Sequence, residues 1–458
     1  MTAPTALGRA AAGPHRTLPP LSAPRPAPPL DVVTALMDNG LRVVAARSSA
    51  VPLVELRLLI PFDGGPAPVG ATAELLAATL LGGASAHGRA ALDDRLADVG
   101  GQLTVRVDPE RFVLAGSALA DGLPRLLDVL ADCLTDPAFE PADVDRERSR
   151  LRQRIEVARR LPKTAVREAL LRRCYGDHPL GRETPEAALV ALADADAVRR
   201  LARERLVPRG ATLVLVGCAE PQATADLVCG ALAGWRSERT VTAPTAPGPV
   251  EGREIDLLPR PGAGQAQIRL AAAALPRTDA GYEALLVANL VLGGYFSSRL
   301  VTELRENLGY VYAARSAIEE HAAGTALTVV GFETGTRTAG AALRAARAEL
   351  VRIAGTDPPT DDEVTAARSY AVGITALLLS GQRGLAHLLL TLASAGLGPD
   401  WLPGHLHRLR TVTPDAVRDA AARFLAPHRF TGVVAGDPGL LLPELDVSSP
   451  AGSSRRTS

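Results

Sequence analysis

Hydrophobic and polar residues alternate along several short segments of the chain, which is the pattern of strands that bury one face. The strands expected in the first half are 41–45, 54–58, 102–107, 112–117 and a closing strand that ends at Gly217. The turn signal Asn39-Gly40 precedes the first of them, and apolar residues at helical spacing predict a helix from about Ala71 to Leu81. Paired strands followed by paired helices predict an α+β unit, in which a mostly antiparallel sheet carries its helices on one face.

The chain repeats this order once, because short motifs recur in the same succession at offsets between 211 and 221 residues. The matching motifs are LGG at 81–83 and 292–294, TDP at 135–137 and 356–358, and LVP at 206–208 with LAP at 425–427. Two similar units, joined by a linker into a clam-like pair, are therefore expected. The predicted segments are a disordered Pro-rich leader at 1–30, a first unit at 31–236, a linker at 237–251, a second unit at 252–440 and a disordered tail at 441–458.

Composition excludes several classes of function. The 458 residues include 50 basic and 50 acidic side chains, which removes the electrostatic reason to expect nucleic acid or an anionic membrane as a partner. Lys163 is the sole lysine, which excludes P-loop NTPases and pyridoxal enzymes. No apolar run reaches the ~18 residues that span a bilayer. The four cysteines lack CxxC spacing and are expected to be buried free thiols, so a cytoplasmic location is predicted.

Two clusters of charged or metal-binding residue types are better explained by structural roles than by nucleic-acid or metal binding. Arginines dominate the segment 146–160, but acidic residues alternate with them, which is typical of a solvated helix face. His405 and His407 form the only close histidine pair, and we expect them on a polar loop after Pro403-Gly404, with no third metal ligand nearby in sequence. His178 is expected to be a structural histidine.

Four segments carry a resemblance to a known family. They are DNGLRV at 38–43, HPLG at 178–181, LGGYFSSRL at 292–300 and ELRENLGYVY at 303–312. Together with the doubled order of elements, they resemble peptidase family M16, the pitrilysin/insulinase family of zinc peptidases. The resemblance is to its smaller two-unit members, such as the bacterial and mitochondrial processing peptidases, and it covers nearly everything between the two tails.

The zinc site of that family is missing from this sequence. Active members carry His-x-x-Glu-His on the first helix of the first unit, and a Glu on a later helix completes the site. By register from Gly70 and Gly82-Gly83, the corresponding positions here are Ala73, Leu76, Ala77 and, on the later helix, Arg154. Methyl groups cannot coordinate zinc, and a guanidinium repels a cation. Glu74 lies on the same helix but one residue out of register, about 100° away from position 73.

The second unit keeps a different part of the family's machinery. Family members carry an Arg and, seven residues later, a Tyr that reach across the cleft to the scissile peptide, and Arg305 and Tyr312 have this spacing. A guanidinium and a phenol can both donate hydrogen bonds to a tetrahedral oxyanion. Tyr310 is a rival for the phenol. The structural alternative is that Arg305 pairs with Glu303 or Glu306 while Tyr312 is half-buried packing.

The resemblance implies a division of labour between two chains. We expect this chain to be the metal-free subunit of a heterodimeric zinc peptidase, with zinc held only by an M16 partner that carries His-x-x-Glu-His. Arg305 and Tyr312 would act in trans, and the pair would enclose peptide substrates such as the leader of a ribosomally made natural product. The alternative is an inactive scaffold or peptide-binding protein of the same fold. An independent zinc peptidase with displaced ligands would instead contain stoichiometric zinc.

Overall fold

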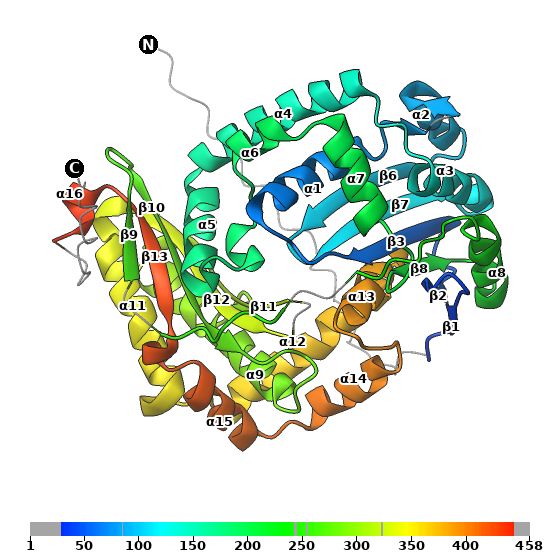
Figure 1. Ribbon diagram of the computed structural model, residues 1–458. Coiled ribbons are helices and arrows are strands. Elements are labelled where there is room, and N and C mark those ends of the chain that lie inside the picture. The colour runs from blue at the N-terminus through cyan, green and yellow to red at the C-terminus, as the bar shows by residue number, and fades with distance from the viewer. Residues whose placement is uncertain (1–28, 85, 242–244, 253–254, 322–323, 444–458) are drawn as a thin grey trace, which may run out of the picture.

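The structure is a computed structural model that describes residues 29–443 apart from 85, 242–244, 253–254 and 322–323, so the predicted leader and tail fall almost wholly outside it. Each half of the chain forms one large sheet (Figure 1). The first sheet has the order β1 (Val32–Leu36), β2 (Arg42–Arg47), β8 (Thr212–Gly217), β3 (Leu53–Pro61), β7 (Arg111–Leu119) and β6 (Gln102–Asp108). The second has the order β11 (Val311–Glu320), β12 (Ala326–Gly335), β10 (Gln265–Ala274), β13 (Thr431–Gly436) and β9 (Ile255–Pro259).

Both sheets are mostly antiparallel, as the sequence predicts. The two parallel pairs are β2 with β8 and β9 with β13, one in each sheet. All five strands predicted for the first half are present, whereas β1 was missed. Its partner β2 follows the predicted turn, where Gly40 takes a φ of 86° and the Asn39 side chain accepts a hydrogen bond from the Leu41 amide at 3.0 Å.

Helices alternate with these strands in both halves. Those of the first half are α1 (Ala67–Thr79), α2 (Arg89–Ala97), α3 (Leu123–Thr135), α4 (Pro141–Arg160), α5 (Pro162–Tyr175), α6 (Ala187–Leu192), α7 (Ala195–Arg205) and α8 (Pro221–Ala231). Those of the second half are α9 (Tyr282–Asn289), α10 (Arg299–Val301), α11 (Ala339–Val351), α12 (Asp361–Leu379), α13 (Gln382–Ser394), α14 (Trp401–Thr411), α15 (Pro414–Phe424) and α16 (Pro438–Leu441). A two-stranded ladder of β4 (Gly83–Ala84) and β5 (His87–Gly88) follows α1.

Each sheet has its own hydrophobic core on the face covered by helices of the same half. In the first half, α1, α3 and α8 bury apolar side chains against the sheet, and in the second half α9, α11 and α15 do the same. The sequence of α1 explains why a helix forms at this position and packs against the sheet. Pro66 stands at the N-cap, where a missing amide hydrogen costs nothing, and six side chains between Ala71 and Thr79 are buried.

The opposite face of each sheet is also covered, which the prediction of helices on one face did not include. Helix α5 of the first half packs on the second sheet, and α13 of the second half packs on the first sheet (Figure 1). Strand residues such as Val44, Val214 and Val216 supply the second apolar face, and Leu385 and Leu389 of α13 lie against them. A sheet that is apolar on both faces needs two layers, and the missing layer comes from the other half.

Polar contacts also hold α5 and α13 against the sheet of the other half. The Gln382 side-chain amide, at the start of α13, donates to the carbonyl oxygens of Ser48, Val51 and Leu53 at 2.8, 3.0 and 3.0 Å. Gln382 is only 5% exposed, so these bonds are shielded from water. On the other side, Arg167 of α5 pairs with Glu319 of β11 at 3.0 Å. The two halves are therefore held together by reciprocal apolar layers and by buried polar anchors.

One stretch of the second half, Tyr282–Asn307, is long and apolar enough to cross a bilayer by length and composition. It is also 61% buried over its most apolar window, where its side chains form much of the second core. The core helix of a folded protein satisfies the same criterion.

Candidate functional site

The helix that corresponds to the family's zinc helix is α1, and its ligand positions lie in the core. Ala73 and Leu76 are fully buried and Ala77 is 8% exposed, all three within the first hydrophobic cluster. Arg154 lies on the exposed side of α4. Three apolar side chains offer zinc no donor atom, so the residues present do not fit the metal. Within the described part of the chain, no group of three or more His, Cys, Asp or Glu side chains could hold a metal ion.

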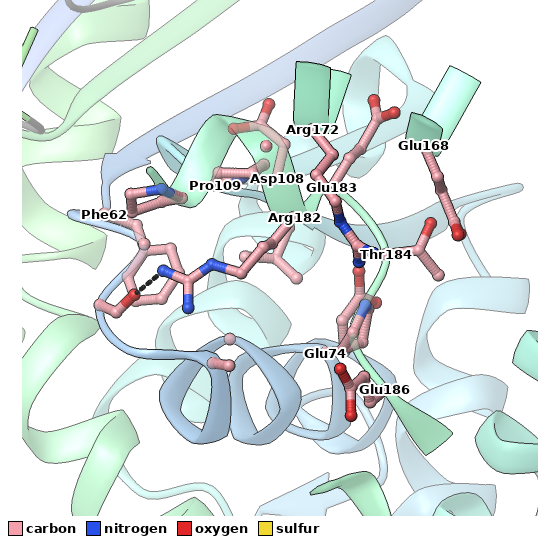
Figure 2. Close-up of a pocket in the computed structure, with 18 of the residues that line it drawn as sticks. Phe62, Glu74, Asp108, Pro109, Glu168, Arg172, Arg182, Glu183, Thr184 and Glu186 are labelled. Carbon is pink, nitrogen blue, oxygen red and sulfur yellow. Dashed lines mark hydrogen bonds between the residues drawn. The ribbon is translucent and has the colours of Figure 1, made fainter. Parts of the chain in front are cut away.

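The neighbouring position on α1 has a polar environment. Glu74 lines a small cavity of about 70 Å³ between α1, the end of β6 and the segment after α5 (Figure 2). Burial raises the pKa of Glu74 to about 7 against the opposing charge of Arg154, and the carboxylates of Asp108 and Glu183 add to the rise. The expected rotation away from position 73 therefore takes Glu74 out of the core and into this cavity.

A glycine loop closes one side of the cavity. Gly64 has a φ of 67°, and a Cβ there would lie 2.4 Å from the Pro179 side chain, so the loop can approach only without one. Arg182 donates to the Gly65 carbonyl oxygen at 3.2 Å, the contact drawn as a dashed line in Figure 2. The cavity thus combines a carboxyl whose pKa lies near neutrality with several arginines, an arrangement that sequence spacing did not indicate.

A larger cavity of about 620 Å³ lies between the two halves. Its floor is the outer face of β3, β6 and β7, its wall is α13, and Arg277 and His321 approach from the second half. Strand β6 is the last strand of its sheet, and β7 is its one strand neighbour among the described residues. An unpaired strand edge beside a cavity can accept an extended peptide as an additional strand.

Arg305 and Tyr312 lie at the edge of the second sheet. A turn at Gly309, with a φ of 63°, separates the helical turn that carries Arg305 from β11, which begins one residue before Tyr312. Tyr312 is 93% exposed, so it is not the half-buried packing residue of the structural alternative. Tyr310 instead packs against the second core, and its carbonyl oxygen accepts a hydrogen bond from Thr334 at 2.7 Å. Of the two tyrosines, Tyr312 is free to reach a substrate.

The Arg305 guanidinium has two local contacts. It stacks over the Phe296 ring, 3.9 Å from its centroid, and its Nε donates to the Glu306 carboxylate at 2.8 Å. The pairing with Glu306 is the one foreseen by the structural alternative. The Arg305 side chain is 22% exposed and that of Glu306 is 58% exposed, and an ion pair at the surface stabilises a protein by only ~0–1 kcal/mol, so Arg305 can exchange Glu306 for another anion at little cost. Phe296 is 73% exposed and adds an aromatic face beside the pair.

The histidine pair does not lie on a loop, and that prediction was wrong. His405 and His407 belong to α14, because Pro403 occupies the first turn of this helix, where its missing amide hydrogen is tolerated. His405 is buried, stacks on Trp401 with ring centroids 4.3 Å apart, and contacts a Glu283 carboxylate oxygen at 2.8 Å. Its role is structural.

Two other predictions about polar residues are confirmed. His178 caps a short 3-10 turn, since its Nδ1 accepts from the Leu180 amide at 3.2 Å. The basic run on α4 pairs with its own helix, as in Arg148–Asp145 at 2.9 Å and Arg150–Glu147 at 2.8 Å. These are contacts of a solvated helix face. All four cysteines are free, with Cys133 and Cys174 buried and the other two partly exposed.

Two family models match the chain. Insulinase (Peptidase family M16) matches residues 72–187, and Peptidase M16 inactive domain matches residues 193–370, together more than half of the chain. The chain belongs to peptidase family M16. The first match includes α1 and α4, so an M16 first half is present although its ligand positions carry Ala, Leu and Arg.

Relatives and solved structures agree with this assignment. An uncharacterised zinc protease of Streptomyces coelicolor is 28% identical over 76% of this chain and 77% of its own length. One of Mycobacterium tuberculosis is 27% identical over 64% and 68%. The crystal structure of a peptidase M16 inactive domain from Pseudomonas fluorescens superposes with a TM-score of 0.82 at 19% identity, covering 92% of this chain and all of that one. A protease from Helicobacter pylori gives 0.81 at 14% identity, covering 89% and all. The two-unit M16 fold is thereby confirmed.

Proposed function

We propose that this chain is the metal-free subunit of a heterodimeric M16 peptidase, in which a partner of similar fold holds the zinc. The observation that carries the proposal is the contrast between the two halves. In the first half, Ala73, Leu76 and Ala77 put apolar side chains at the three positions on α1 that would bind zinc or activate its water, and a cationic Arg154 stands at the ligand position on α4. The second half presents Tyr312 and Arg305 at its surface, where neither is required by its own core.

The chemistry of Arg305 and Tyr312 fits peptide hydrolysis. Attack of water on a peptide carbonyl places negative charge on its oxygen, and a guanidinium and a phenol can both donate to that oxygen. Such a donor contributes on the order of 3 kcal/mol when its bond strengthens only in the transition state. In this proposal the partner supplies the metal and the activated water, and this chain supplies Arg305 and Tyr312.

The relatives support a link to proteolysis, since several are named zinc proteases. The free edge of β6 beside the large cavity supports peptides as the substrate class, because an extended peptide can pair with it. Short or unfolded peptides are favoured, because they can extend along this edge without first leaving a folded structure. Removal of a leader from a peptide precursor would be one reaction of this kind.

The experiment is peptide cleavage by the mixed complex. We expect Tyr312→Phe and Arg305→Gln to lower kcat by about a hundredfold each, while gel filtration still shows the complex. Tyr310→Phe is the matched control, because it removes the same hydroxyl two residues away from a ring that packs against the core. Unchanged turnover in both variants would refute the oxyanion role. Loss of turnover in Tyr310→Phe alone would move the role to Tyr310.

The alternative is a catalytically inactive scaffold or peptide-binding protein, which the apolar packing of Ala73, Leu76 and Ala77 favours equally. Peptide cleavage by the chain combined with a partner that carries His-x-x-Glu-His distinguishes the two functions. Zinc analysis of the purified chain belongs to the same experiment. Stoichiometric zinc, or chelator-sensitive hydrolysis by the chain alone, would overturn both readings.

A further inference from the structure

The large cavity between the halves has an uneven balance of charge. Strand alternation directs Gln102, Thr104 and Arg106 of β6 toward it, while Leu103, Val105 and Val107 pack against the first core. Five arginines line the cavity, against three carboxylates. Each carboxylate pairs with an arginine that also lines the cavity: Glu55 with Arg57 at 2.7 Å, Asp108 with Arg111 at 2.9 Å and Glu320 with Arg277 at 2.6 Å.

Two cationic side chains are left over for a ligand. Arg106 is exposed on the free edge strand and has no hydrogen bond or ion pair within the described residues. Arg383 shares Glu55 with Arg57 at a longer distance of 3.3 Å, and its side chain is 73% exposed. A cavity wall concentrates the field of such unneutralised charges and attracts anions.

The arginines of the cavity also act on a histidine of α13. Burial lowers the pKa of His387 on α13, and the charges of Arg57, Arg111 and Arg277 lower it further. These arginines therefore raise the potential in the cavity although each has a carboxylate partner. A smaller cavity of about 190 Å³ shares Asp108 and other residues with this one.

The acidic groups of that smaller cavity are already engaged within the chain. Arg167 binds Glu183 at 2.6 Å and Glu319 at 3.0 Å. Glu110 is 3% exposed and lies 3.5 Å from the His321 ring. The smaller cavity therefore leaves the surplus of positive charge at Arg106 and Arg383 in place.

We propose that the large cavity selects acidic peptides: a peptide strand paired with the edge of β6 places Asp or Glu side chains beside Arg106, and Arg383 adds positive potential from the start of α13. The proposal rests on the proposed function for its substrate class, peptides, and adds the charge that the substrate carries. Alternate side chains of a paired strand face the same way as Thr104 and Arg106, so acidic residues at every second position fit best.

The test measures binding to the full chain without any partner, by fluorescence anisotropy. The probe is a labelled peptide of about ten residues, long enough to span β6, with Glu at alternate positions and Thr or Val between them. Its matched control carries Gln at every Glu position, which keeps shape and hydrogen bonding and removes charge. We expect the acidic peptide to bind about tenfold more tightly at low salt, and the difference to shrink as salt screens the charges.

Substitutions in the chain locate the effect. Arg106→Gln should weaken binding of the acidic peptide about three- to fivefold and leave the Gln peptide unchanged, and Arg383→Gln should weaken it less, because Arg383 lies farther from the edge of β6. Arg125→Gln is the control, because Arg125 is an exposed arginine of α3, on the opposite face of the same sheet. Equal affinity for the two peptides, or equal effects of Arg106→Gln and Arg125→Gln, would overturn the charge selection.

The outcome is separable from that of the proposed function. Partner-dependent cleavage that needs Arg305 and Tyr312 but ignores substrate charge would leave the composite peptidase standing and remove the acidic preference. Selective binding of the acidic peptide through Arg106, with no cleavage by any zinc-bearing partner, would support the acidic preference and argue against the composite peptidase.

Discussion

Glu74 makes the stability of the first half depend on pH, and Glu74→Gln should remove that dependence. Burial raises the pKa of this carboxyl from 4.5 to about 7 in the folded chain. The unfolded chain therefore releases the proton first, and the folded state loses stability as pH rises from about 4.5 to 7. Below that window the side chain is protonated in both states and costs nothing.

The size of the effect follows from the shift. One pKa unit corresponds to about 1.4 kcal/mol, so the folded state should lose about 2–3 kcal/mol between pH 5 and pH 8 through this one group. Glutamine has the same shape and no charge to desolvate. Glu74→Gln should therefore exceed the free energy of unfolding of the parent chain by less than about 1 kcal/mol at pH 5 and by about 3 kcal/mol at pH 8.

The two tryptophans allow the first half to be followed separately. Trp235 is 2% exposed in the first core, whereas Trp401 belongs to the second half. In a Trp401→Phe background, urea unfolding at pH 5, 6, 7 and 8 can be read from Trp235 fluorescence. Glu204→Gln, on the exposed side of α7, is the matched control. Parallel pH profiles for Glu74→Gln and the parent chain would refute the claim that Glu74 is desolvated.

Two further predictions concern the second half. Gln382→Ala should lower the free energy of unfolding by about 2 kcal/mol in urea titration, because three shielded carbonyl oxygens lose their donor, whereas the exposed Gln222→Ala should have little effect. His405→Ala should cost about 2–4 kcal/mol in the same assay, because it removes a partner and a packed ring from the buried Glu283. A loss below ~0.5 kcal/mol in either variant would contradict its reasoning.

The elements themselves followed from local pattern. Alternation located β2, β3, β6, β7 and β8, and helical spacing located α1, because one-sided burial imposes a period on the residues that form it. The family motifs likewise located Arg305 and Tyr312 by spacing alone. Strand β1 was missed, since its short sequence VVTAL has no regular alternation. The loop predicted around His405 failed because a proline in the first turn of a helix resembles a helix breaker.

The arrangement of the candidate site could not be predicted from local sequence pattern. Glu74 was expected only to point away from position 73, and its raised pKa comes from burial by distant segments, with smaller contributions from the carboxylates of Asp108 and Glu183. The surplus charge at Arg106 depends on which carboxylates are already engaged by other arginines, and the cavity brings together such pairs from both halves: Glu55–Arg57 and Asp108–Arg111 from the first, and Glu320–Arg277 from the second.

The sequence by itself determined the doubled α+β order, the absence of zinc ligands on α1 and the spacing of Arg305 and Tyr312, because each depends on residue types at short separations. Tertiary structure alone decided that α5 and α13 exchange sheets, that Glu74 faces a cavity and that Arg106 stands unpaired beside a free strand edge. Burial, pairing and exposure depend on contacts between segments that are distant in the sequence. Local periodicity does not specify which distant segments will pack together.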